Sequence, residues 1–382
     1  GTASSWTLTA LPLFVWMGEI LFRTRLSENL FKGLSPWMQK LPGGLIHVNV
    51  VGCALFAAIS GSSAATVATV GKMSIPELRK RNYPEKILLG SLAGSGTLGL
   101  LIPPSIILII YGVAVQESIA KLFIAGIIPG IMIALIFMSY VIIWSLINKE
   151  EMPKILEEFS FFEKIKRSKQ LLPVILLISA VIGSIYTGIA TATEAASLGV
   201  VGALILSYFQ KSLSLETFKS SLLGATKTSC MIAFILAGST FLSLAMGFTG
   251  LPRNLALWIQ NMDLSPYILI LVLMIFYIIL GMFLDGISAV VLTMAIIEPM
   301  IRQAGFDMIW FGIFLVIVVE MAQITPPVGF NLFVLQGMAN KDMGYIAQSA
   351  FPLFLLMVLA VILVVIFPQI ALWLPEQMVQ NL

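Results

Sequence analysis

Two short polar motifs interrupt long apolar stretches of this sequence. Residues 60–63 are Ser-Gly-Ser-Ser, and residues 285–288 are Asp-Gly-Ile-Ser. Two double prolines, Pro103-Pro104 and Pro326-Pro327, interrupt two further apolar stretches. A proline pair removes two backbone donors and frees carbonyl oxygens about one turn earlier. Because carbonyl, hydroxyl and carboxylate oxygens suit a hard cation such as sodium, these four breaks predict cation binding.

Small and oxygen-bearing residues near the breaks predict two cation sites, each formed by one polar motif and one double proline. The candidate ligands from residue type are Ser60, Ser62, Gly281, Asp285 and Thr325. A charged side chain in the middle of a bilayer costs about 2.5–3.5 kcal/mol, so we expect Asp285 to neutralise a bound cation. The alternative interpretation is that the double prolines are only helix kinks.

Four other carboxylates occur in apolar segments, at Glu19, Glu194, Glu298 and Glu320. Glu320 is expected either to hold a helix in place or to form a hydrogen bond with a residue that binds the cation. Glu19 and Glu298 lie near the ends of apolar stretches, where an acidic residue usually has a structural partner.

Motifs for other kinds of chemistry are missing from the sequence. His47 is the only histidine, which excludes a two-histidine metal site, and Cys53 and Cys230 form no disulfide pattern. No Walker-type loop, G-x-S-x-G elbow or H-E-x-x-H pair occurs. The sequence therefore predicts neither nucleotide-driven transport nor an enzyme. Basic patches with interleaved aromatics are also lacking, so no nucleic-acid partner is expected.

The elements that position these residues must lie in a lipid bilayer. Of the 382 residues, 59% are hydrophobic and 11% are charged, and the mean hydropathy is +1.00. So few charges cannot cover the surface of a water-soluble protein of this size. Apolar runs long enough to cross a membrane recur along the whole chain. We therefore expect an all-α polytopic membrane protein.

The four breaks fall inside four expected membrane elements. Residues 42–71 and 266–300 each carry a polar motif in the middle, which predicts two re-entrant helical hairpins. Residues 87–113 and 309–338 carry the double prolines, which predicts two broken transmembrane helices. Irregular backbone at this depth is tolerated only where it is buried in protein or binds water, an ion or a substrate.

An internal repeat relates these elements in pairs. A shift of 225 residues aligns Thr24 with Thr249, Gly61 with Gly286 and Ser63 with Ser288. The double prolines align after a two-residue deletion. Secondary transporters are often built from two such repeats.

Lysine and arginine indicate the orientation of the repeats, because they accumulate on the cytoplasmic side. The flanks of the first hairpin hold nine basic residues: Arg23, Arg25, Lys32, Lys40, Lys72, Arg79, Lys80, Arg81 and Lys86. The matching flanks of the second hairpin hold only Arg253 and Arg302. Equivalent flanks are therefore expected on opposite faces of the membrane, as an inverted-topology repeat requires.

These observations predict three parts of the chain. Residues 1–147 form the first repeat, residues 148–170 a charged cytoplasmic linker, and residues 171–382 the second repeat. If the second repeat begins near Leu171, its counterpart would begin roughly 50 residues before Gly1. We therefore expect that a helix pair at the N-terminal end of the first repeat is missing from this sequence.

Three sequence runs resemble a known transporter family. They are LGLLIPPSIILIIYG at residues 98–112, GIATATEAASLG at 188–199 and ITPPVGFNLFVLQG at 324–337. Together with the two hairpin motifs, they are similar to the large membrane subunit of tripartite ATP-independent periplasmic (TRAP) transporters. The resemblance extends over nearly the whole chain.

The resemblance implies sodium-coupled uptake across the bacterial inner membrane. In this family a soluble periplasmic binding protein delivers the substrate, and a smaller four-helix membrane subunit, separate or fused, braces a scaffold. The hairpins and broken helices are expected to move past that scaffold as an elevator. Substrates of the family are mostly carboxylates or sulfonates, including C4-dicarboxylates and sialic acid.

The resemblance also implies the residues of the two kinds of site. The implied sodium ligands are Ser60, Gly61, Ser62, Pro103, Gly281, Asp285, Thr325, Val328 and Gly329. The implied substrate contacts are Ser62, Ser63, Thr97, Ser105, Asp285, Ser288 and Asn331. One position departs from the family pattern, since many relatives have an aspartate where this chain has Thr66. The number of coupled sodium ions is therefore open.

Three other functions remain as alternatives at this stage. A dicarboxylate/sodium-type elevator carrier would use the same breaks without a binding protein. An intramembrane enzyme would need a nucleophile with a base, or paired aspartates, and only Asp285 lies at a suitable position. A channel is disfavoured because no repeated ring of pore-lining residues is evident.

Overall fold

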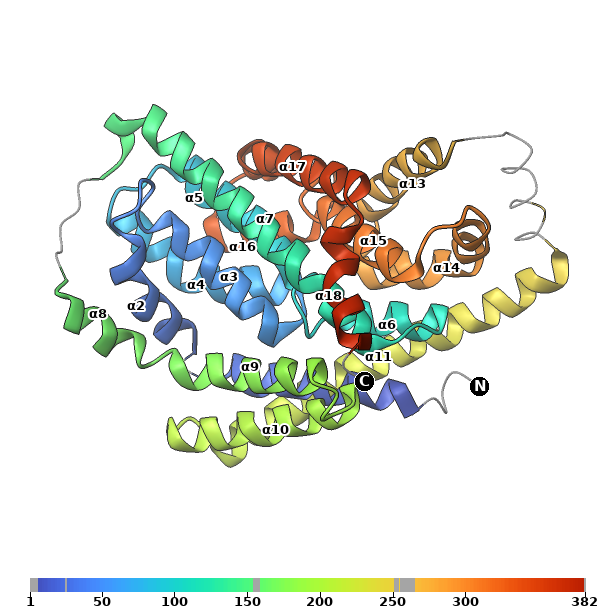
Figure 1. Ribbon diagram of the computed structural model, residues 1–382. Coiled ribbons are helices and arrows are strands. Elements are labelled where there is room, and N and C mark those ends of the chain that lie inside the picture. The colour runs from blue at the N-terminus through green and yellow to red at the C-terminus, as the bar shows by residue number, and fades with distance from the viewer. Residues whose placement is uncertain (1–5, 25, 154–158, 251–253, 255–264, 381–382) are drawn as a thin grey trace.

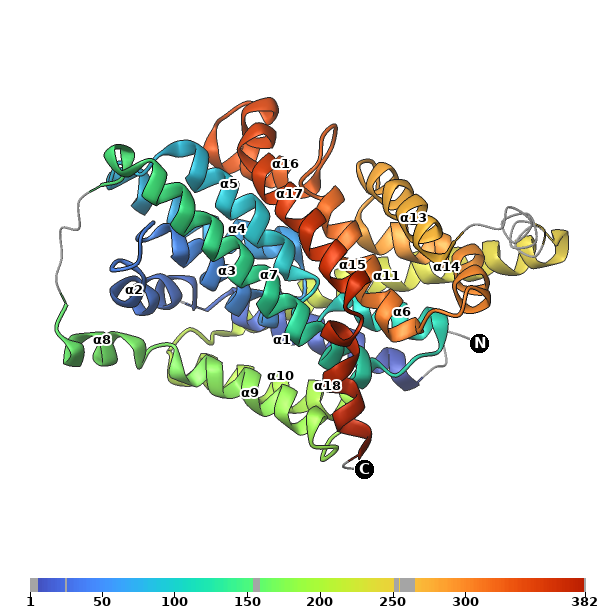
Figure 2. The same ribbon diagram turned by 45° about the horizontal axis from the view of Figure 1, so that its top comes forward.

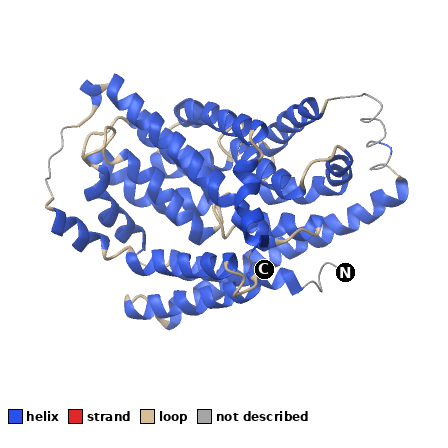
Figure 3. Cartoon of the chain, in the orientation of Figure 1, coloured by secondary structure: helices blue, strands red, loops and turns tan. Residues whose placement is uncertain are grey.

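The chain folds into helices throughout the part that the computed structural model describes. Residues 6–24, 26–153, 159–250, 254 and 265–380 are described, and every regular element in these ranges is a helix (Figures 1 and 3). Five of the described helices are long and apolar enough to cross a membrane alone, and a bent helix pair can make a sixth span. The prediction of an all-α polytopic membrane protein is confirmed.

The first hairpin forms because glycine and serine stop one helix and start the next. Helix α3 (Ile46–Ser60) ends at Gly61, which has a left-handed backbone with φ of 57°. Ser62 then caps α4 (Ser63–Lys80), and its side chain accepts a hydrogen bond from Ala65 N. The second arm is longer than the predicted range 42–71, because residues 72–80, four of which are charged, continue the helix.

The first double proline separates two short helices. Helix α5 (Glu85–Gly96) continues into a 3₁₀ turn at Thr97–Gly99, and the chain then leaves the helical path until α6 (Ile106–Val115). Ser105 caps α6 through a hydrogen bond from Leu108 N at 3.4 Å. Helix α7 (Ile119–Ile147) follows as one long span. A helix broken within the predicted range 87–113 is thus observed.

The same order of elements occurs again after residue 265. Helices α13 (Pro266–Gly281) and α14 (Gly286–Gln303) form the second hairpin. Helices α15 (Met308–Ala322) and α16 (Phe330–Ala339) are separated by the second break, and α17 (Met343–Ile366) matches α7. Both double prolines contain a cis peptide bond. Residues 286–288, expected at the hairpin tip, are already helical, and the turn consists of residues 282–285.

The two repeats are packed into one another. Helix α5 packs on α17, and its counterpart α15 packs on α7, so that each broken helix contacts the long helix of the other repeat (Figure 2). Gly90 and Gly94 of α5 allow the first of these contacts. A Cβ atom at Gly94 would lie 2.7 Å from Leu353 Cβ, and one at Gly90 would overlap the carbonyl oxygen of Ser349. Opposite orientation of the repeats in the membrane stays a prediction.

The remaining helices lie along one side of the hairpins. Helix α1 (Ala10–Phe22) packs against α10 (Ala192–Phe209) and α11 (Leu215–Thr249), and α10 packs on α9 (Leu172–Tyr186) (Figure 1). Helices α2 (Leu26–Met38) and α18 (Gln369–Gln380) complete the bundle.

The described part of the expected linker contains a 3₁₀ turn at Lys149–Glu151 and a short α-helix, α8 (Phe161–Ser168). Helix α8 starts with a capping box formed by Ser160 and Glu163. Residues 154–158 of the linker lie outside the described residues, as does Arg253.

Candidate functional site

The first hairpin tip lies directly against the first break. A Cβ atom at Gly61 would lie 3.0 Å from the carbonyl oxygen of Pro104. A Cβ atom at Gly99 would lie 2.7 Å from the carbonyl oxygen of Ser62. Only glycine permits these approaches, so the two glycines bring the backbone of tip and break together. Residues 60–63 and the double proline at 103–104, which the sequence predicts to form one cation site, thus lie next to each other in the structure.

The hydroxyl groups of this tip form a local network. Ser60 Oγ and Thr66 Oγ1 are 2.8 Å apart, and Thr66 Oγ1 also donates to Ser62 O at 2.8 Å. Thr66, the position that departs from the family pattern, thus ties the end of α3 to the start of α4. Ser63 Oγ donates to Oε1 of Glu320, which is fully buried on α15.

The second hairpin tip is organised by Asp285. Its carboxylate caps α14 by accepting hydrogen bonds from the backbone N–H groups of Ile287 at 3.1 Å and Ser288 at 3.2 Å. The Ser288 hydroxyl donates to the same carboxylate. A Cβ atom at Gly286 would lie 3.4 Å from Leu100 Cδ1, so this tip contacts the first break.

Both tips open into one cavity of about 490 Å³. Five of the predicted site residues line it, namely Ser60, Gly61, Ser62, Ser63 and Asp285. Leu100, Ile106, Gln323 and Phe330 bring both broken helices to its wall. The cavity therefore joins parts of all four predicted breaks, although these are far apart in sequence.

Other predicted site residues do not line this cavity. Thr97, Ser105 and Asn331 are each no more than 1% exposed and lie inside the protein. Thr97 Oγ1 donates to Gly94 O at 2.6 Å, and Ser105 Oγ donates to Leu100 O, so both hydroxyls satisfy local backbone. The side-chain atoms of Asn331 are buried without hydrogen-bond partners in the described part of the chain.

The remaining candidates lie at the first break, in the second hairpin and at the second break. Pro103, Gly281 and Gly329 are buried, Ser288 and Thr325 are half-buried, and Val328 is exposed. The Thr325 hydroxyl donates to Met321 O at 2.8 Å, and Gly329 has a positive φ of 46°. A Cβ atom at Gly281 would lie 2.6 Å from Ala322 Cβ, which places the second hairpin against the end of α15.

The other wall of the cavity comes from α1 and α11. The wall contains Glu19 and Phe22 of α1 and Thr228 and Met231 of α11. Sequence reasoning treated Glu19 as structural, and the structure places it in the lining as well. Its signal in the sequence was a carboxylate within an apolar run, whereas Thr228 and Met231 gave no signal.

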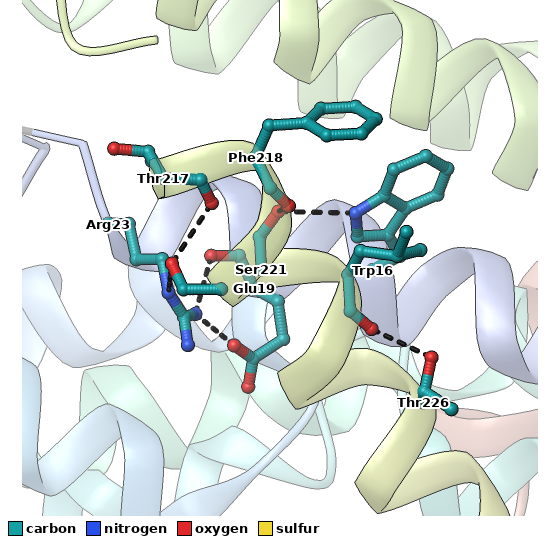
Figure 4. A network of polar contacts seen from close by, with 9 residues as sticks. Trp16, Glu19, Arg23, Thr217, Phe218, Ser221 and Thr226 are labelled. Atoms are coloured by element: carbon teal, nitrogen blue, oxygen red, sulfur yellow. Dashed lines mark hydrogen bonds and ion pairs between the residues drawn. The ribbon is translucent and has the colours of Figure 1, made fainter. Parts of the chain in front are cut away.

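A polar network fixes these two helices together (Figure 4). Arg23 forms an ion pair with Glu19 and donates to Ser220 Oγ at 3.1 Å. Trp16 Nε1 donates to Ser221 Oγ at 3.3 Å, and its ring meets the edge of Phe218. This connected pair of helices is suited to act as a rigid wall.

Asp285 is the unpaired carboxylate among the described residues that line the cavity. Glu19 also lines it, but its charge is balanced by Arg23, and no lysine or arginine occurs among the described lining residues. An organic anion in such a space needs compensating cations or backbone N–H groups, because unpaired charge is costly inside a membrane. The arrangement suits joint binding of an anion and cations at the ends of half-helices.

Nearly the whole chain matches a known transporter family. Residues 1–370 match the family described as "Tripartite ATP-independent periplasmic transporter, DctM component". The C4-dicarboxylate TRAP transporter large permease protein DctM of Pseudomonas aeruginosa is 33% identical over 98% of this chain and 87% of its own length.

Two other relatives carry different substrate names. The sialic acid TRAP transporter large permease protein SiaM of Vibrio cholerae is 30% identical over 98% of this chain and 88% of its own length. The isethionate TRAP transporter permease protein DctMQ of Oleidesulfovibrio alaskensis is 33% identical over 94% of this chain, but only 56% of its own length is matched.

A solved structure shares the fold. The Alcanivorax borkumensis YdaH transporter, whose crystal structure is described as having an unusual topology, superposes with a TM-score of 0.56. The match covers 96% of this chain and 85% of that chain, at 13% sequence identity. The helical architecture is therefore shared, and the family is given by the sequence: this chain belongs to the DctM component family of tripartite ATP-independent periplasmic transporters.

Proposed function

We propose that this chain is the permease subunit of a sodium-coupled importer of a small organic acid. The observation that carries the proposal is the cavity in which two hairpin tips and two broken helices meet around Asp285. Freed carbonyls, serine hydroxyls and one carboxylate offer oxygen ligands for sodium. The half-helices that begin at both tips offer N-termini that favour the carboxylate or sulfonate of a substrate.

Sodium supplies the energy in this proposal. A membrane potential contributes about 2.3 kcal/mol per elementary charge per 100 mV, so inward movement of excess sodium can concentrate an anion. The lining lacks basic side chains in the described chain, which makes bound sodium the natural partner of the substrate charge.

The mechanism that we propose is an elevator in the bacterial inner membrane. The hairpins and broken helices, which pack into one unit across the repeats, would move past the wall formed by α1 and α11. A periplasmic binding protein would deliver the substrate, and a small four-helix membrane subunit, separate or fused, would extend the scaffold. The names of the relatives favour a C4-dicarboxylate, sialic acid or a small sulfonate as substrate.

Uptake by proteoliposomes tests the proposal. The liposomes contain this chain and its small subunit, and a cognate binding protein loaded with radiolabelled succinate, sialic acid or isethionate is added outside. We expect accumulation of one of these acids with an inward sodium gradient and none with potassium. Equal uptake in potassium would refute sodium coupling, and uptake without the binding protein would favour a carrier that works alone. A thermal-shift screen of the binding protein selects the acid to use.

A further inference from the structure

The two hairpin tips share a contact that the repeat alone does not predict. Ser63 and Ser288 occupy equivalent positions under the 225-residue shift. In both tips this serine donates its hydroxyl to a carboxylate: Ser288 to Asp285, and Ser63 to Glu320. The same serine–carboxylate pair is therefore built twice.

The two carboxylates reach their tips by different routes. Asp285 belongs to the tip that it caps, and its counterpart in the first repeat is Ser60, which has no charge. Glu320 comes from α15 of the second repeat, and its counterpart in the first repeat is Thr97. The carboxyl group next to the first tip therefore comes from the second repeat, because the first tip has no acidic residue of its own.

The carboxyl group of Glu320 is buried and has few polar partners. Its side chain is fully buried, and its Oε2 atom lacks a hydrogen-bond partner of normal geometry within the described chain. No ion pair with Glu320 is found among the described residues. The start of α4 contributes a favourable helix dipole, which offsets only part of the cost of burying a carboxylate.

We infer that Glu320 supplies, from the second repeat, the negative charge that balances a cation held at the first hairpin tip. This inference rests on the proposed sodium coupling. Glu320 is a positioning residue in this account: it holds Ser63 in place and stabilises the nearby cation through its charge. Each tip then has one carboxylate.

Three variants separate a charge role from a purely structural bond. Glu320→Gln keeps the shape and the acceptor oxygen but removes the charge, whereas Glu320→Asp keeps the charge and shortens the side chain. Ser60→Asp combined with Glu320→Gln places a carboxylate at the position equivalent to Asp285. Glu298→Gln is the matched control, because Glu298 pairs with Arg302 at the far end of α14.

The readouts are the sodium concentration for half-maximal uptake and the sodium-induced rise in melting temperature of the purified complex. For Glu320→Gln we expect half-saturation to rise about tenfold, and for Glu320→Asp a smaller rise. The double variant should regain most of the lost affinity, and the control should match the wild type. If Glu320→Gln behaves as the wild type, or if Glu320→Asp is more impaired than Glu320→Gln, the charge role is wrong.

Two further outcomes are distinguishable. A wild-type complex without sodium dependence defeats the proposed function itself, whereas a sodium-dependent wild type with an unaffected Glu320→Gln variant defeats only this inference. If Glu320→Gln does not assemble, Ser63→Ala replaces it, since it removes the hydroxyl donor and leaves the carboxylate. We then expect half-saturation to rise about threefold, and an unchanged value would overturn the inference.

Discussion

Asp285 combines two roles that can be separated by one substitution. As the cap of α14 it accepts two backbone hydrogen bonds, and as a cavity residue it presents charge to a cation. Asparagine caps a helix as well as aspartate does, so Asp285→Asn should leave the amount of folded protein nearly unchanged. Loss of the charge should raise the sodium concentration for half-maximal uptake about tenfold.

Asp307→Asn is the control for this substitution. Asp307 caps α15 through the N–H groups of Ile309 and Trp310 in the same way, at 2.8 and 2.9 Å, and it does not line the cavity. Sodium titrations of uptake should therefore shift for Asp285→Asn and not for Asp307→Asn. An identical response of the two variants would remove Asp285 from the sodium site.

Residue types predicted the tips better than they predicted the contacts around them. Sequence reasoning identified residues 60–63 and Asp285 because burying polar or charged side chains in a membrane costs free energy unless they bind a partner. The bond between Ser63 and Glu320 joins residues 257 positions apart, so no local pattern contains it. Thr97 and Ser105 were expected to contact substrate, yet their hydroxyls donate to backbone carbonyls, of Gly94 and Leu100 respectively, which a sequence cannot reveal.

The helix breaks depend on close packing that sequence motifs mark only by glycine. At Gly99 a Cβ atom would lie 2.6 Å from Ser63 Cα and 2.7 Å from Ser62 O, both of which are backbone atoms. Gly99→Ala should therefore push the first hairpin away from the first break. We expect a loss of stability of about 1–3 kcal/mol, measured as a lower melting temperature, together with weaker sodium stabilisation.

A second glycine provides the comparison. Gly183 lies in α9 with no atom within 4 Å of a Cβ built on it, so alanine fits there. Gly183→Ala should be neutral or stabilising by about 0.5–1 kcal/mol, because alanine favours a helix. If Gly99→Ala proves as harmless as Gly183→Ala, the tight junction of tip and break does not exist in solution.

Element type was predictable here, whereas element length was less so. Apolar length and the double prolines identified both hairpins and both broken helices, since few other structures satisfy backbone groups in lipid. The far end of α4 was missed because four of residues 72–80 are charged, so the segment does not have the pattern of a membrane span, although it continues the helix to Lys80. Helix continuation through polar residues is decided by contacts outside the segment.

The whole molecule is arranged as two interlocked repeats beside a helical wall. Helices α5 and α15 pack against the long helices of the opposite repeat, so the four breaks are held in one unit. Helices α1 and α11 are joined by the network around Arg23 and Trp16 and border the same cavity. Movement of the unit against this wall, as proposed above, would carry both tips together with the bound sodium and substrate.

The account requires that the four breaks form two sodium sites, one for each tip. Equilibrium binding of radioactive sodium to the purified complex of this chain and its small subunit measures this directly. We predict saturable binding of about two ions per chain, with the affinity of one weakened by Asp285→Asn and that of the other by Glu320→Gln. Absence of saturable sodium binding would contradict the account.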